Sequence, residues 1–475
     1  MPRPPEDVPA SWPPDPPPPP TPPPGFSITS PIPKYSGAFG PAQAERLLWR
    51  AGFGPRRGEA EAFAALGLER AVTTLTRPSG VAVLTGPPPR DSAGYPLLPY
   101  EKWGDDHNYW VDRMIRSEQQ LVERMALVFH DWFACNLPTV QNQKQVVNQI
   151  HLFRKFSVGS FKDLIHEVTQ DPAMMEMLDQ VRNRRGAVNE NYARELMELF
   201  TLGANNFTEQ DVREAARALT GWKVDYAQDV GAPEDNYYYQ PLRHDSNPKT
   251  IFGQTGAFDW EDVCRMVVEH PAHPRFFVTK LWSYFVPVPP SDSVRAALEN
   301  LYVSSGYDIR RVLEAILSSE EFYRGPTLTK PPVVLLAGLL RGRGRFFERQ
   351  DWVAYCQEAG QRLHFPPDVS GWNDALWLDS NSMPNRWAIA HEVLAGSLTT
   401  SANWSTHAVA EAPDQAVDAA MRFWNRVTPL SARSRDVLVA FAAATAVTGA
   451  DPVGAARREN ALRQLIPSLP DYQVC

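Results

Sequence analysis

The chain has 475 residues, of which 43% are hydrophobic and 11% aromatic, and its formal net charge is −8 at pH 7. A chain of this length can bury a large core, and this composition excludes a wholly disordered protein. The acidic balance gives no reason to expect nucleic acid as a partner.

The first forty residues are rich in proline and contain the run WPPDPPPPPTPPPG. Such a run favours an exposed polyproline II segment, which a proline-recognising module can bind in an aromatic-lined groove. We therefore expect a disordered or extended arm over residues 1–40 and a single large helical domain over residues 41–475.

The sequence predicts no targeting or membrane-spanning segment. No apolar stretch follows MPRPPEDVPA, so no secretory signal peptide is expected, and the location is cytoplasmic by default. The longest uncharged apolar run, residues 437–450, is too short to cross a bilayer. The wide spacing of the cysteines favours isolated thiols over a zinc site or a disulfide framework. They are Cys135, Cys264, Cys356 and Cys475.

Beyond residue 40 the spacing of the apolar residues is overwhelmingly helical. They recur with a period of about 3.6 between residues 117 and 134, and Ser160 and Asp171 have the sequence context of helix N-caps. Further helices are predicted over residues 259–269, 274–286, 292–302 and 308–322. The expected fold is therefore mainly α: a compact multi-helix bundle with long irregular inserts and at most a small β-hairpin.

Two segments break the helical pattern. Residues 223–258 contain NYYYQPLRHDSNPKTIFGQTG, which is rich in aromatic and turn-forming residues and has no helical period. An irregular insert of this length inside a compact domain is usually functional or flexible, and its aromatic and glycine content favours an ordered one. A tryptophan-rich loop is expected over residues 364–386.

The densest polar pattern lies in AVNENYARELMELFTLGANNFTEQDVREAARALTGW, residues 187–222, which predicts a helical hairpin. Its first helix ends at Gly203, and Thr208 and Asp211 form a capping box for the second. On a helical wheel the apolar residues of the first helix form a continuous arc, and Glu195 lies at the border of that arc. Glu195 is therefore the carboxylate that we expect to be partly buried.

Two interpretations of this helix stay open. Glu190, Arg194 and Glu198 are spaced by four residues, which suits an exposed string of ion pairs with no further role. Alternatively, Asn191, Glu195 and Glu198 act as metal ligands or acid/base groups together with residues from another segment. In that case Arg194 helps to bind the substrate.

The histidines have a similar ambiguity. His244 and Asp245 lie in the irregular insert, where an adjacent His-Asp pair can supply a metal ligand or a general base, with Lys249 nearby in the sequence. The alternative is a turn in which Asp245 caps local backbone amides. His130 lies at the edge of the apolar face of its helix, where a histidine is more often a hydrogen-bonded core residue than a ligand.

The tryptophan-rich loop also has two interpretations. Asp368, Trp372, Trp377 and Arg386 could line a cleft for a sugar or a peptide. The tryptophans could equally fill the interior of the helix bundle, and we favour this packing role.

The sequence lacks the standard catalytic motifs. His166-Glu167 and His391-Glu392 are both without the second histidine of HExxH. The sequence also contains no GxSxG, Walker A loop or GxGxxG, so the α/β-hydrolase, P-loop and dinucleotide-binding classes have no support. The paired Glu-x-x-His of the di-iron bundles is missing as well.

A set of sequence blocks, in order along the chain, carries a family resemblance. The blocks are AERLLWRAGFGP, FHDWFACN, FRKFSVGSFKDLIHEVTQDPAMMEMLD, NENYARELMELFTLG, FTEQDVREAARALTGW, RHDSNPKTIFGQTG, HPRFFVTKLWSYFV, YDIRRVLEAILSSEEF and FPPDVSGWNDALWL. They resemble the bacterial domain-of-unknown-function family DUF1800, from residue 40 or so to the C-terminus. The resemblance implies a mostly helical protein, often secreted and often encoded beside a DUF1501 partner. It supplies no accepted activity.

The chain departs from the family pattern at two histidine motifs. Family members commonly show Trp-His-x-His-Phe, whereas residues 129–133 are FHDWF, without the second histidine. The usual HDxGxK is HDSNPK at residues 244–249, with the glycine lost and one residue gained. If these histidines bind metal in relatives, the site is altered in this chain.

Two functions follow from these patterns. The first is a hydrolase or transferase that acts on a saccharide or a peptide by metal-assisted or acid/base chemistry. Its catalytic groups are Glu195, His244, Asp245 and Lys249, and its substrate-binding residues are Asn191, Arg194, Trp372, Trp377 and Arg386. A divalent metal ion would be held by Glu195, Glu198, His244 and His130.

The second function is a non-catalytic helical scaffold that binds a partner protein. The partner is a DUF1501-type companion, as the resemblance implies, or a module that recognises the proline-rich arm. The polyproline run is the feature of the sequence that favours this function.

Overall fold

The structure is a computed structural model that describes residues 27–225, 236–345, 351–395, 412–446 and 451–475. In these residues the chain forms twenty-three α-helices and four short strands, which confirms the prediction of a mainly α fold. Most of the predicted proline-rich arm, residues 1–26, lies outside the described residues. The remainder of the arm packs against the helices, because the side chains of Ile28 and Ile32 are buried in the core.

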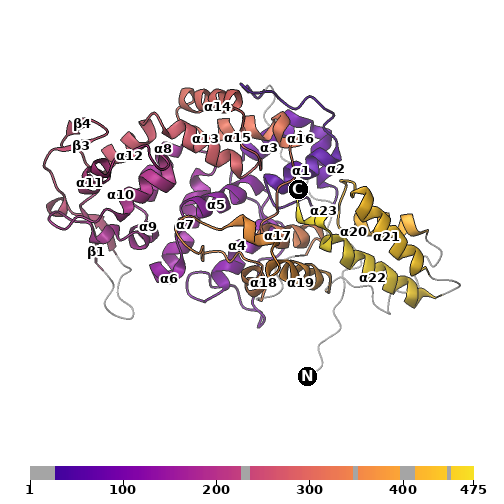
Figure 1. The fold of residues 1–475 in the computed structure, drawn as a ribbon. Coiled ribbons are helices and arrows are strands. Elements are labelled where there is room, and N and C mark those ends of the chain that lie inside the picture. Colours follow the sequence, from indigo (N-terminus) through magenta and orange to yellow (C-terminus); the bar gives the residue numbers. More distant parts are fainter. Residues whose placement is uncertain (1–26, 226–235, 346–350, 396–411, 447–450) are drawn as a thin grey trace.

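The N-terminal part of the chain forms nine helices, among which α5 lies near the centre of the molecule (Figure 1). They are α1 (Pro41–Arg50), α2 (Glu59–Leu66), α3 (Leu68–Thr76), α4 (Asp105–Arg116), α5 (Gln120–Trp132), α6 (Leu137–Val140), α7 (Gln143–Phe156), α8 (Phe161–Thr169) and α9 (Pro172–Met177), followed by the 3₁₀ turn η1 (Gln180–Arg182). Ser160 and Asp171 cap α8 and α9, as predicted, by accepting hydrogen bonds from the backbone amides of Asp163 and Met174.

The predicted helical hairpin is present. Its first helix begins as α10 (Asn191–Glu195) and continues as η2 (Leu196–Thr201), a π-helix. The amide of Leu202 accordingly bonds the carbonyl of Met197, five residues earlier. Gly203 follows with a left-handed φ of 79°, as expected after a helix C-terminus. Thr208 and Asp211 form the predicted capping box of α11 (Glu209–Ala218).

The irregular insert contains two small antiparallel sheets of two strands each. β1 (Trp222–Asp225) pairs with β2 (Asn236–Tyr239), so that Trp222 lies opposite Tyr239. After the 3₁₀ turn η3 (Pro241–Arg243), β3 (Lys249–Ile251) pairs with β4 (Gln254–Gly256). Figure 1 shows these strands at one end of the molecule, beside α11.

The remaining helices complete the bundle, and the last of them form its opposite end (Figure 1). They are α12 (Trp260–Glu269), α13 (His273–Ser283), α14 (Asp292–Ser304), α15 (Ile309–Leu317), α16 (Glu320–Arg324), α17 (Pro332–Gly342), α18 (Trp352–Glu358), the 3₁₀ turn η4 (Asp374–Leu378), α19 (Ser382–Ala395), α20 (Pro413–Phe423), α21 (Ala432–Ala444), α22 (Pro452–Ser468) and α23 (Pro470–Gln473). The helix predicted over residues 308–322 is divided in two, because Ser319 caps a new helix at the amide of Phe322. The tryptophan-rich loop is shorter than expected, because α19 begins at Ser382.

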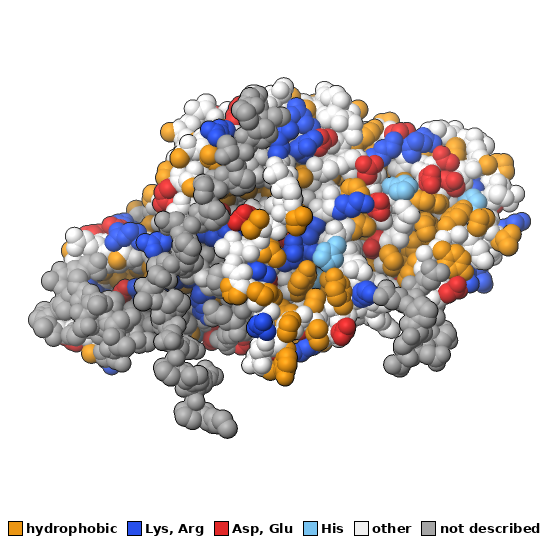
Figure 2. Space-filling model, turned by 180° about the vertical axis from the view of Figure 1, so that it is seen from behind, with side chains coloured by type: hydrophobic (Ala, Val, Ile, Leu, Met, Phe, Trp, Pro, Cys, Tyr) orange, Lys and Arg blue, Asp and Glu red, His pale blue; other side chains and the backbone are white. Residues whose placement is uncertain are grey.

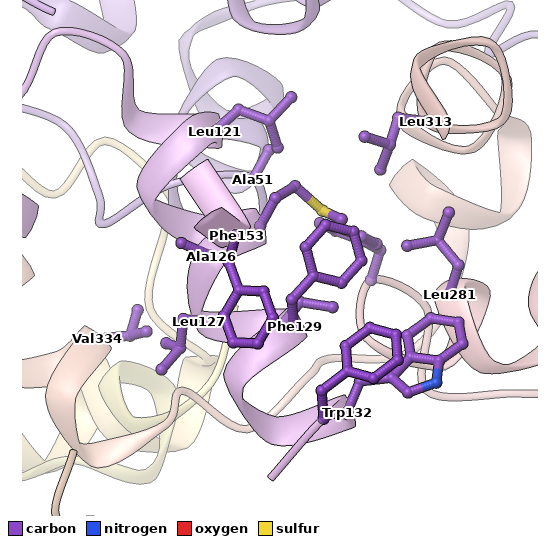
Figure 3. Close-up of a cluster of buried hydrophobic side chains, with 14 of the residues drawn as sticks. Ala51, Leu121, Ala126, Leu127, Phe129, Trp132, Phe153, Leu281, Leu313 and Val334 are labelled. Atoms are coloured by element: carbon purple, nitrogen blue, oxygen red, sulfur yellow. The ribbon is translucent and has the colours of Figure 1, made fainter. Parts of the chain in front are cut away.

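α5 supplies the centre of the hydrophobic core. Leu121, Phe129 and Trp132 are fully buried in that core. They lie beside residues of other helices, such as Leu281 of α13 and Leu313 of α15 (Figure 3). Burying one such side chain contributes roughly 1.5–3 kcal/mol relative to leaving it in water. These core contacts therefore fix the C-terminal end of α5, where the polar residues His130 and Asp131 lie.

The surface carries charges of both signs. Figure 2 shows acidic and basic side chains interspersed with apolar ones over one face of the molecule. In the described part of the chain, no helix combines the length and the hydropathy needed to cross a bilayer. The four cysteines are free thiols, as their wide separation predicts, and the side chains of Cys135, Cys264 and Cys356 are buried.

Candidate functional site

The C-terminal end of α5 is joined to the loop between α18 and α19. The Nε2 atom of His130 accepts a hydrogen bond from the backbone amide of His364 (3.0 Å). The carboxylate of Asp131 accepts one from the backbone amide of Trp372 (2.7 Å) and one from the hydroxyl of Tyr284 (2.7 Å). Neighbouring residues of one helix therefore hold the loop and the end of α13.

Four side chains, three of them from distant segments, bond the carbonyl groups at the end of η2 and at Leu202. A helix terminus leaves its last carbonyls without helical partners, and π-helices are rare and occur often at functional sites. Each side chain donates to one backbone carbonyl: Lys280 to that of Leu199 (3.1 Å), Trp132 to that of Phe200 (3.2 Å), His273 to that of Thr201 (2.9 Å) and Asn206 to that of Leu202 (3.0 Å). Because Lys280 and His273 belong to α13, this helix and α5 together position the π turn.

Asp131, Lys280, Tyr284 and Trp372 are all half-buried, and we call them the Asp131 cluster. Burial raises the pKa of the Asp131 carboxyl and lowers the pKa of the Lys280 ammonium to about 8, since each charge has lost water. The attraction between the Asp131 carboxylate and the Lys280 ammonium opposes both pKa shifts. Burial also raises the pKa of Tyr284 well above its usual value, so its hydroxyl stays a donor to Asp131. Burial thus brings the pKa of Lys280 closer to neutral pH than the usual lysine value.

Glu195 lies where the sequence predicts, at the border of the apolar face. Its side chain is half-buried, and burial, followed by the charge of Glu198, raises its pKa. Among the described residues its carboxylate makes no hydrogen bond and no ion pair. Asn191 is exposed at the start of α10. The roles predicted for these residues stay predictions.

Arg194 belongs to a group of surface ion pairs. Its guanidinium lies 3.4 Å from the carboxylate of Glu190 and 2.7 Å from that of Glu209 on α11. The hydrogen bond to Glu209 is the main cause of the raised pKa of Arg194. These contacts match the ion-pair interpretation, except that Glu209 takes the place expected for Glu198.

Asp245 is tied to α11 and to its own turn. Its carboxylate accepts hydrogen bonds from the guanidinium of Arg217 (2.8 Å) and the backbone amide of Asn247 (3.0 Å). Burial disfavours the ionised form, but these hydrogen bonds outweigh it and lower the pKa of Asp245 to about 2. The bond to the local amide is the turn-capping role that the sequence offers as the alternative to catalysis.

His244 and Lys249 hold the same insert in place. The Nδ1 atom of His244 bonds the backbone carbonyl of Thr220 (2.9 Å), and the ammonium of Lys249 donates to the carbonyl of Phe258 (2.7 Å). Lys249 is buried, and burial lowers its pKa. His244 and Lys249 therefore anchor the insert, and the catalytic role predicted for them stays a prediction.

His130 is fully buried in a group of aromatic rings. Its ring lies 5.5 Å from those of Trp110 and His364 and 5.3 Å from that of Trp372. Burial lowers its pKa well below the usual value. In the part of the chain that the structure describes, no three His, Cys, Asp or Glu side chains are grouped so as to hold a metal ion. The metal site of Glu195, Glu198, His244 and His130 stays a prediction.

Trp377 and Arg386 lie inside the bundle and are 8% and 0% exposed. Arg386 donates hydrogen bonds to the side-chain oxygen of Gln473 (2.7 Å) and to the backbone carbonyl of Lys330 (2.9 Å). These bonds tie α19 to the C-terminal segment and to the chain just before α17. The buried position of Trp377 matches the packing role that the sequence favours for the tryptophans, whereas Trp372 is half-buried.

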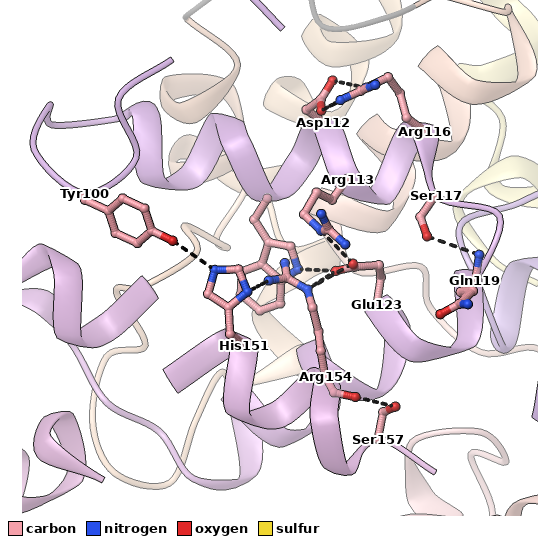
Figure 4. A network of polar contacts seen from close by, with 11 residues as sticks. Tyr100, Asp112, Arg113, Arg116, Ser117, Gln119, Glu123, His151, Arg154 and Ser157 are labelled. Carbon is pink, nitrogen blue, oxygen red and sulfur yellow. Dashed lines mark hydrogen bonds and ion pairs between the residues drawn. The ribbon is translucent and has the colours of Figure 1, made fainter. Parts of the chain in front are cut away.

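Trp110 links the ring of His130 to a buried ion-pair network centred on Glu123 (Figure 4). The carboxylate of Glu123 accepts hydrogen bonds from Arg113 (2.9 Å), Arg154 (2.8 Å) and the indole of Trp110 (3.1 Å). Burial alone raises the pKa of Glu123, but the two arginines outweigh it and lower that pKa. A carboxylate with these three donors is saturated, so the network positions α4, α5 and α7 rather than exchanging protons.

Asp131, Lys280 and Tyr284 were not among the residues predicted from the sequence. Asp131 and Tyr284 are separated by 153 positions, and neither belongs to a recognised catalytic motif. A signal was nevertheless present, because FHDWFACN and HPRFFVTKLWSYFV carry these three residues. Both blocks contribute to the family resemblance.

The comparison with protein-family models agrees with these blocks. A family model described as "Protein of unknown function (DUF1800)" matches residues 46–474, which is nearly the whole chain. No curated protein and no solved structure matches the chain. The chain therefore belongs to the DUF1800 family.

Proposed function

We propose that the protein is a hydrolase or transferase that uses acid/base chemistry, with the Asp131 cluster as its catalytic centre. The proposal rests on the pKa of about 8 that burial gives Lys280, whose charge interacts with that of the half-buried Asp131 carboxylate. A general base works best when its pKa lies near the working pH, and groups with shifted pKa values concentrate at active sites.

In this proposal Lys280 accepts the proton. Its neutral amine takes a proton from the attacking water or hydroxyl, and the carboxylate of Asp131 stabilises the ammonium so formed. Hydrogen bonds from Tyr284 and the amide of Trp372 fix the direction of that carboxylate. The bond to the carbonyl of Leu199 positions the amine. A base held in this way accelerates a reaction by roughly 10²–10⁴-fold.

Trp372 supports a saccharide or a peptide as the substrate. Its backbone amide is bonded to Asp131, and the residue is only half-buried. An aromatic ring offers an apolar face on which a sugar ring or a peptide side chain can stack.

The metal-assisted version of the function has less support from the contacts of the predicted ligands. His130 uses one ring nitrogen to accept a hydrogen bond from the amide of His364, and His244 uses one to bond the carbonyl of Thr220. Binding a metal through these nitrogens would break the contacts that hold the loop and the insert. The acid/base centre requires no such change.

Lys280→Arg tests the proposal. Arginine keeps the positive charge and a donor for Leu199, but it does not lose its proton in proteins and so cannot act as a base. Wild type and variant are assayed on a panel of aryl glycosides and peptide amides, at pH values on both sides of the pKa of Lys280. We expect wild-type turnover to rise with pH through that pKa, and the variant to be slower by roughly 10²–10⁴-fold.

Lys162→Arg is the matched control, because the exposed ammonium of Lys162 pairs with Glu269 on the surface. The circular dichroism spectra of both variants report whether the fold is kept. Turnover that survives in Lys280→Arg contradicts the proposal. A wild-type protein that turns over no member of the panel contradicts it as well.

The scaffold function is favoured by a different observation, the exposed apolar side chains between α3 and α4. Val81, Tyr95 and Trp103 are 92%, 68% and 64% exposed. Large exposed apolar side chains concentrated in one segment are typical of protein-binding surfaces. A DUF1501-type companion or a proline-recognising module would be the partner. The double variant Tyr95→Ser/Trp103→Ser should bind a purified companion protein more weakly. Its catalytic turnover should be unchanged.

A further inference from the structure

Three histidines lie together beneath the loop between α18 and α19. His107 of α4, His130 of α5 and His364 of the loop are each at most 1% exposed, and we call them the histidine cluster. The rings of His130 and His364 are 5.5 Å apart, and the ring of Trp110 lies 5.5 Å from both. The acid/base chemistry proposed above uses none of the three.

Two of these histidines hold the loop through consecutive backbone amides. The amide of Leu363 donates to Nδ1 of His107 (3.1 Å), and that of His364 donates to Nε2 of His130 (3.0 Å). Burial lowers the pKa of both histidines well below the usual value, so the rings are neutral. A neutral imidazole has one lone pair and one N–H, and the lone pairs are in use. The N–H groups therefore lie at Nε2 of His107 and Nδ1 of His130.

Neither of these N–H groups has a hydrogen-bond partner among the described residues. The same holds for Nε and Nη2 of Arg362, whose side chain is buried. A buried polar group without a partner costs about 1–3 kcal/mol, and native structures contain few of them. Their concentration in one place indicates that a molecule other than the protein satisfies them.

His364 also has a strained backbone. Its φ is 64°, in the left-handed region that a non-glycine residue enters at a cost of roughly 1–2 kcal/mol. Burial lowers the pKa of its ring to about 3, although the neighbouring carbonyl of Asp106 favours the protonated form. The ring is therefore neutral and has an N–H to donate. Strain at a buried polar residue is typical of a functional site.

We infer that the histidine cluster, with Arg362, binds an oxyanion, the carboxylate or phosphate group of a small molecule. The unpartnered N–H groups of His107, His130 and Arg362 suit an oxygen-rich acceptor. A metal cation does not fit, because the lone pairs of His107 and His130 already accept backbone amides. Burial raises the pKa of Asp106, whose charge interacts with that of Arg362. Both of its buried carboxylate oxygens lack a hydrogen-bond partner as well.

Two tryptophans lie at the edge of this site. Trp110 is oriented by its hydrogen bond to Glu123, within the network of Figure 4. The ring of Trp372 lies 5.3 Å from that of His130, and its amide bonds Asp131. Trp372, a member of the Asp131 cluster, thus also packs against the histidine cluster. The binding site goes beyond the proposed function and does not depend on it.

Two substitutions can remove the N–H donors without releasing the loop. In His107→Asn the side-chain oxygen stands in for Nδ1 and can still accept from Leu363, but the donor at Nε2 is lost. In His130→Gln the side-chain oxygen stands in for Nε2 and can still accept from His364, but the donor at Nδ1 is lost. His166→Asn is the control, since His166 of α8 contacts Gln170 and Trp260 instead.

Equilibrium dialysis of the full chain against inorganic phosphate and against acetate measures the binding. We expect wild type and His166→Asn to bind one of the two anions, and His107→Asn and His130→Gln to bind it at least about tenfold more weakly, the factor that corresponds to 1.4 kcal/mol. Preference for phosphate or for acetate identifies the group. Thermal unfolding in the absence of anion shows that both variants fold.

Two results overturn the inference. In the first, wild type binds neither anion, which means that the cluster holds buried water only. In the second, folded His107→Asn and His130→Gln bind as tightly as the wild type.

Discussion

The ammonium nitrogen of Lys280 lies 3.1 Å from the carbonyl oxygen of Leu199, so one side chain ties α13 to the π turn η2. The same nitrogen lies over the ring of Trp132, 5.0 Å from its centre. The indole of Trp132 in turn donates to Phe200, the next residue of the turn. The π turn in the NENYARELMELFTLG block is therefore positioned by residues of two other family blocks.

Replacing Trp132 by phenylalanine should destabilise the protein. The ring would still fill most of the space, but the buried carbonyl of Phe200 would lose its donor, at a cost of about 1–3 kcal/mol. Urea unfolding measures the free energy. Trp103→Phe, at an exposed position, should cost less than about 0.5 kcal/mol. Equal losses in the two variants would contradict the role given to Trp132.

Arg217→Met should loosen the insert. Arg217 bonds both Asp245 (2.8 Å) and Glu214 (2.7 Å), so its removal leaves two carboxylates short of a partner, at roughly 1–3 kcal/mol. Limited proteolysis should then cut within residues 223–258 faster than in the wild type. Arg213→Met, on the same helix but exposed, is the control and should cut at the wild-type rate. Unchanged cleavage in Arg217→Met would show that other contacts hold the insert.

Glu195→Gln distinguishes the two placements of the active site. With the centre at Lys280, the variant keeps its turnover. It also gains about 0.2–0.5 kcal/mol, because the repulsion between Glu195 and Glu198 is removed. With the metal site predicted from the sequence, the variant loses bound metal and activity. Turnover, urea unfolding and metal analysis of the purified proteins separate the outcomes, and the second result contradicts the placement at Lys280.

The buried His130 should make stability depend on pH below about 6.5, the usual histidine value. Its folded pKa is lowered, so the unfolded chain binds the proton first, and the free energy of unfolding falls as pH falls through this range. In the His130→Gln variant, this pH-dependent loss of stability is absent. The stability difference between wild type and variant should therefore shift by roughly 2 kcal/mol toward the variant between about pH 7 and pH 5.

The comparison with His130→Gln is needed because buried acids act in the opposite direction. Burial raises the pKa of Asp171 to about 7, so the folded state takes up a proton there as pH falls and gains stability. The difference between the two proteins cancels this contribution. A difference that does not change with pH would mean that His130 is not neutral in the fold.

Local rules predicted much of the helical framework. The N-caps at Ser160 and Asp171, the capping box from Thr208 to Asp211 and the border position of Glu195 depend on neighbours within one or two turns, and all were predicted. Arg194 shows the limit of such reasoning. Its strongest partner, Glu209, lies on the next helix, so a wheel of one helix cannot include it.

The candidate site depends on contacts between distant segments. Asp131, Lys280 and Tyr284 acquire their altered pKa values only when α5, α13 and the loop meet, and no spacing within one segment indicates this. The π turn is also a tertiary effect, because side chains from α5 and α13 bond its last carbonyls. A wheel drawn at the α-helical angle assumes the geometry that these contacts change.

The central claim is tested most directly by the pKa of Lys280 itself. Nuclear magnetic resonance of protein with isotope-labelled lysine follows each side-chain signal with pH, and the Lys280→Arg spectrum identifies the signal of Lys280. The account predicts a pKa of about 8, well below the usual lysine value of 10.5. A pKa at or above 10.5 would mean that Lys280 stays an ammonium ion at neutral pH and would contradict its role as a base.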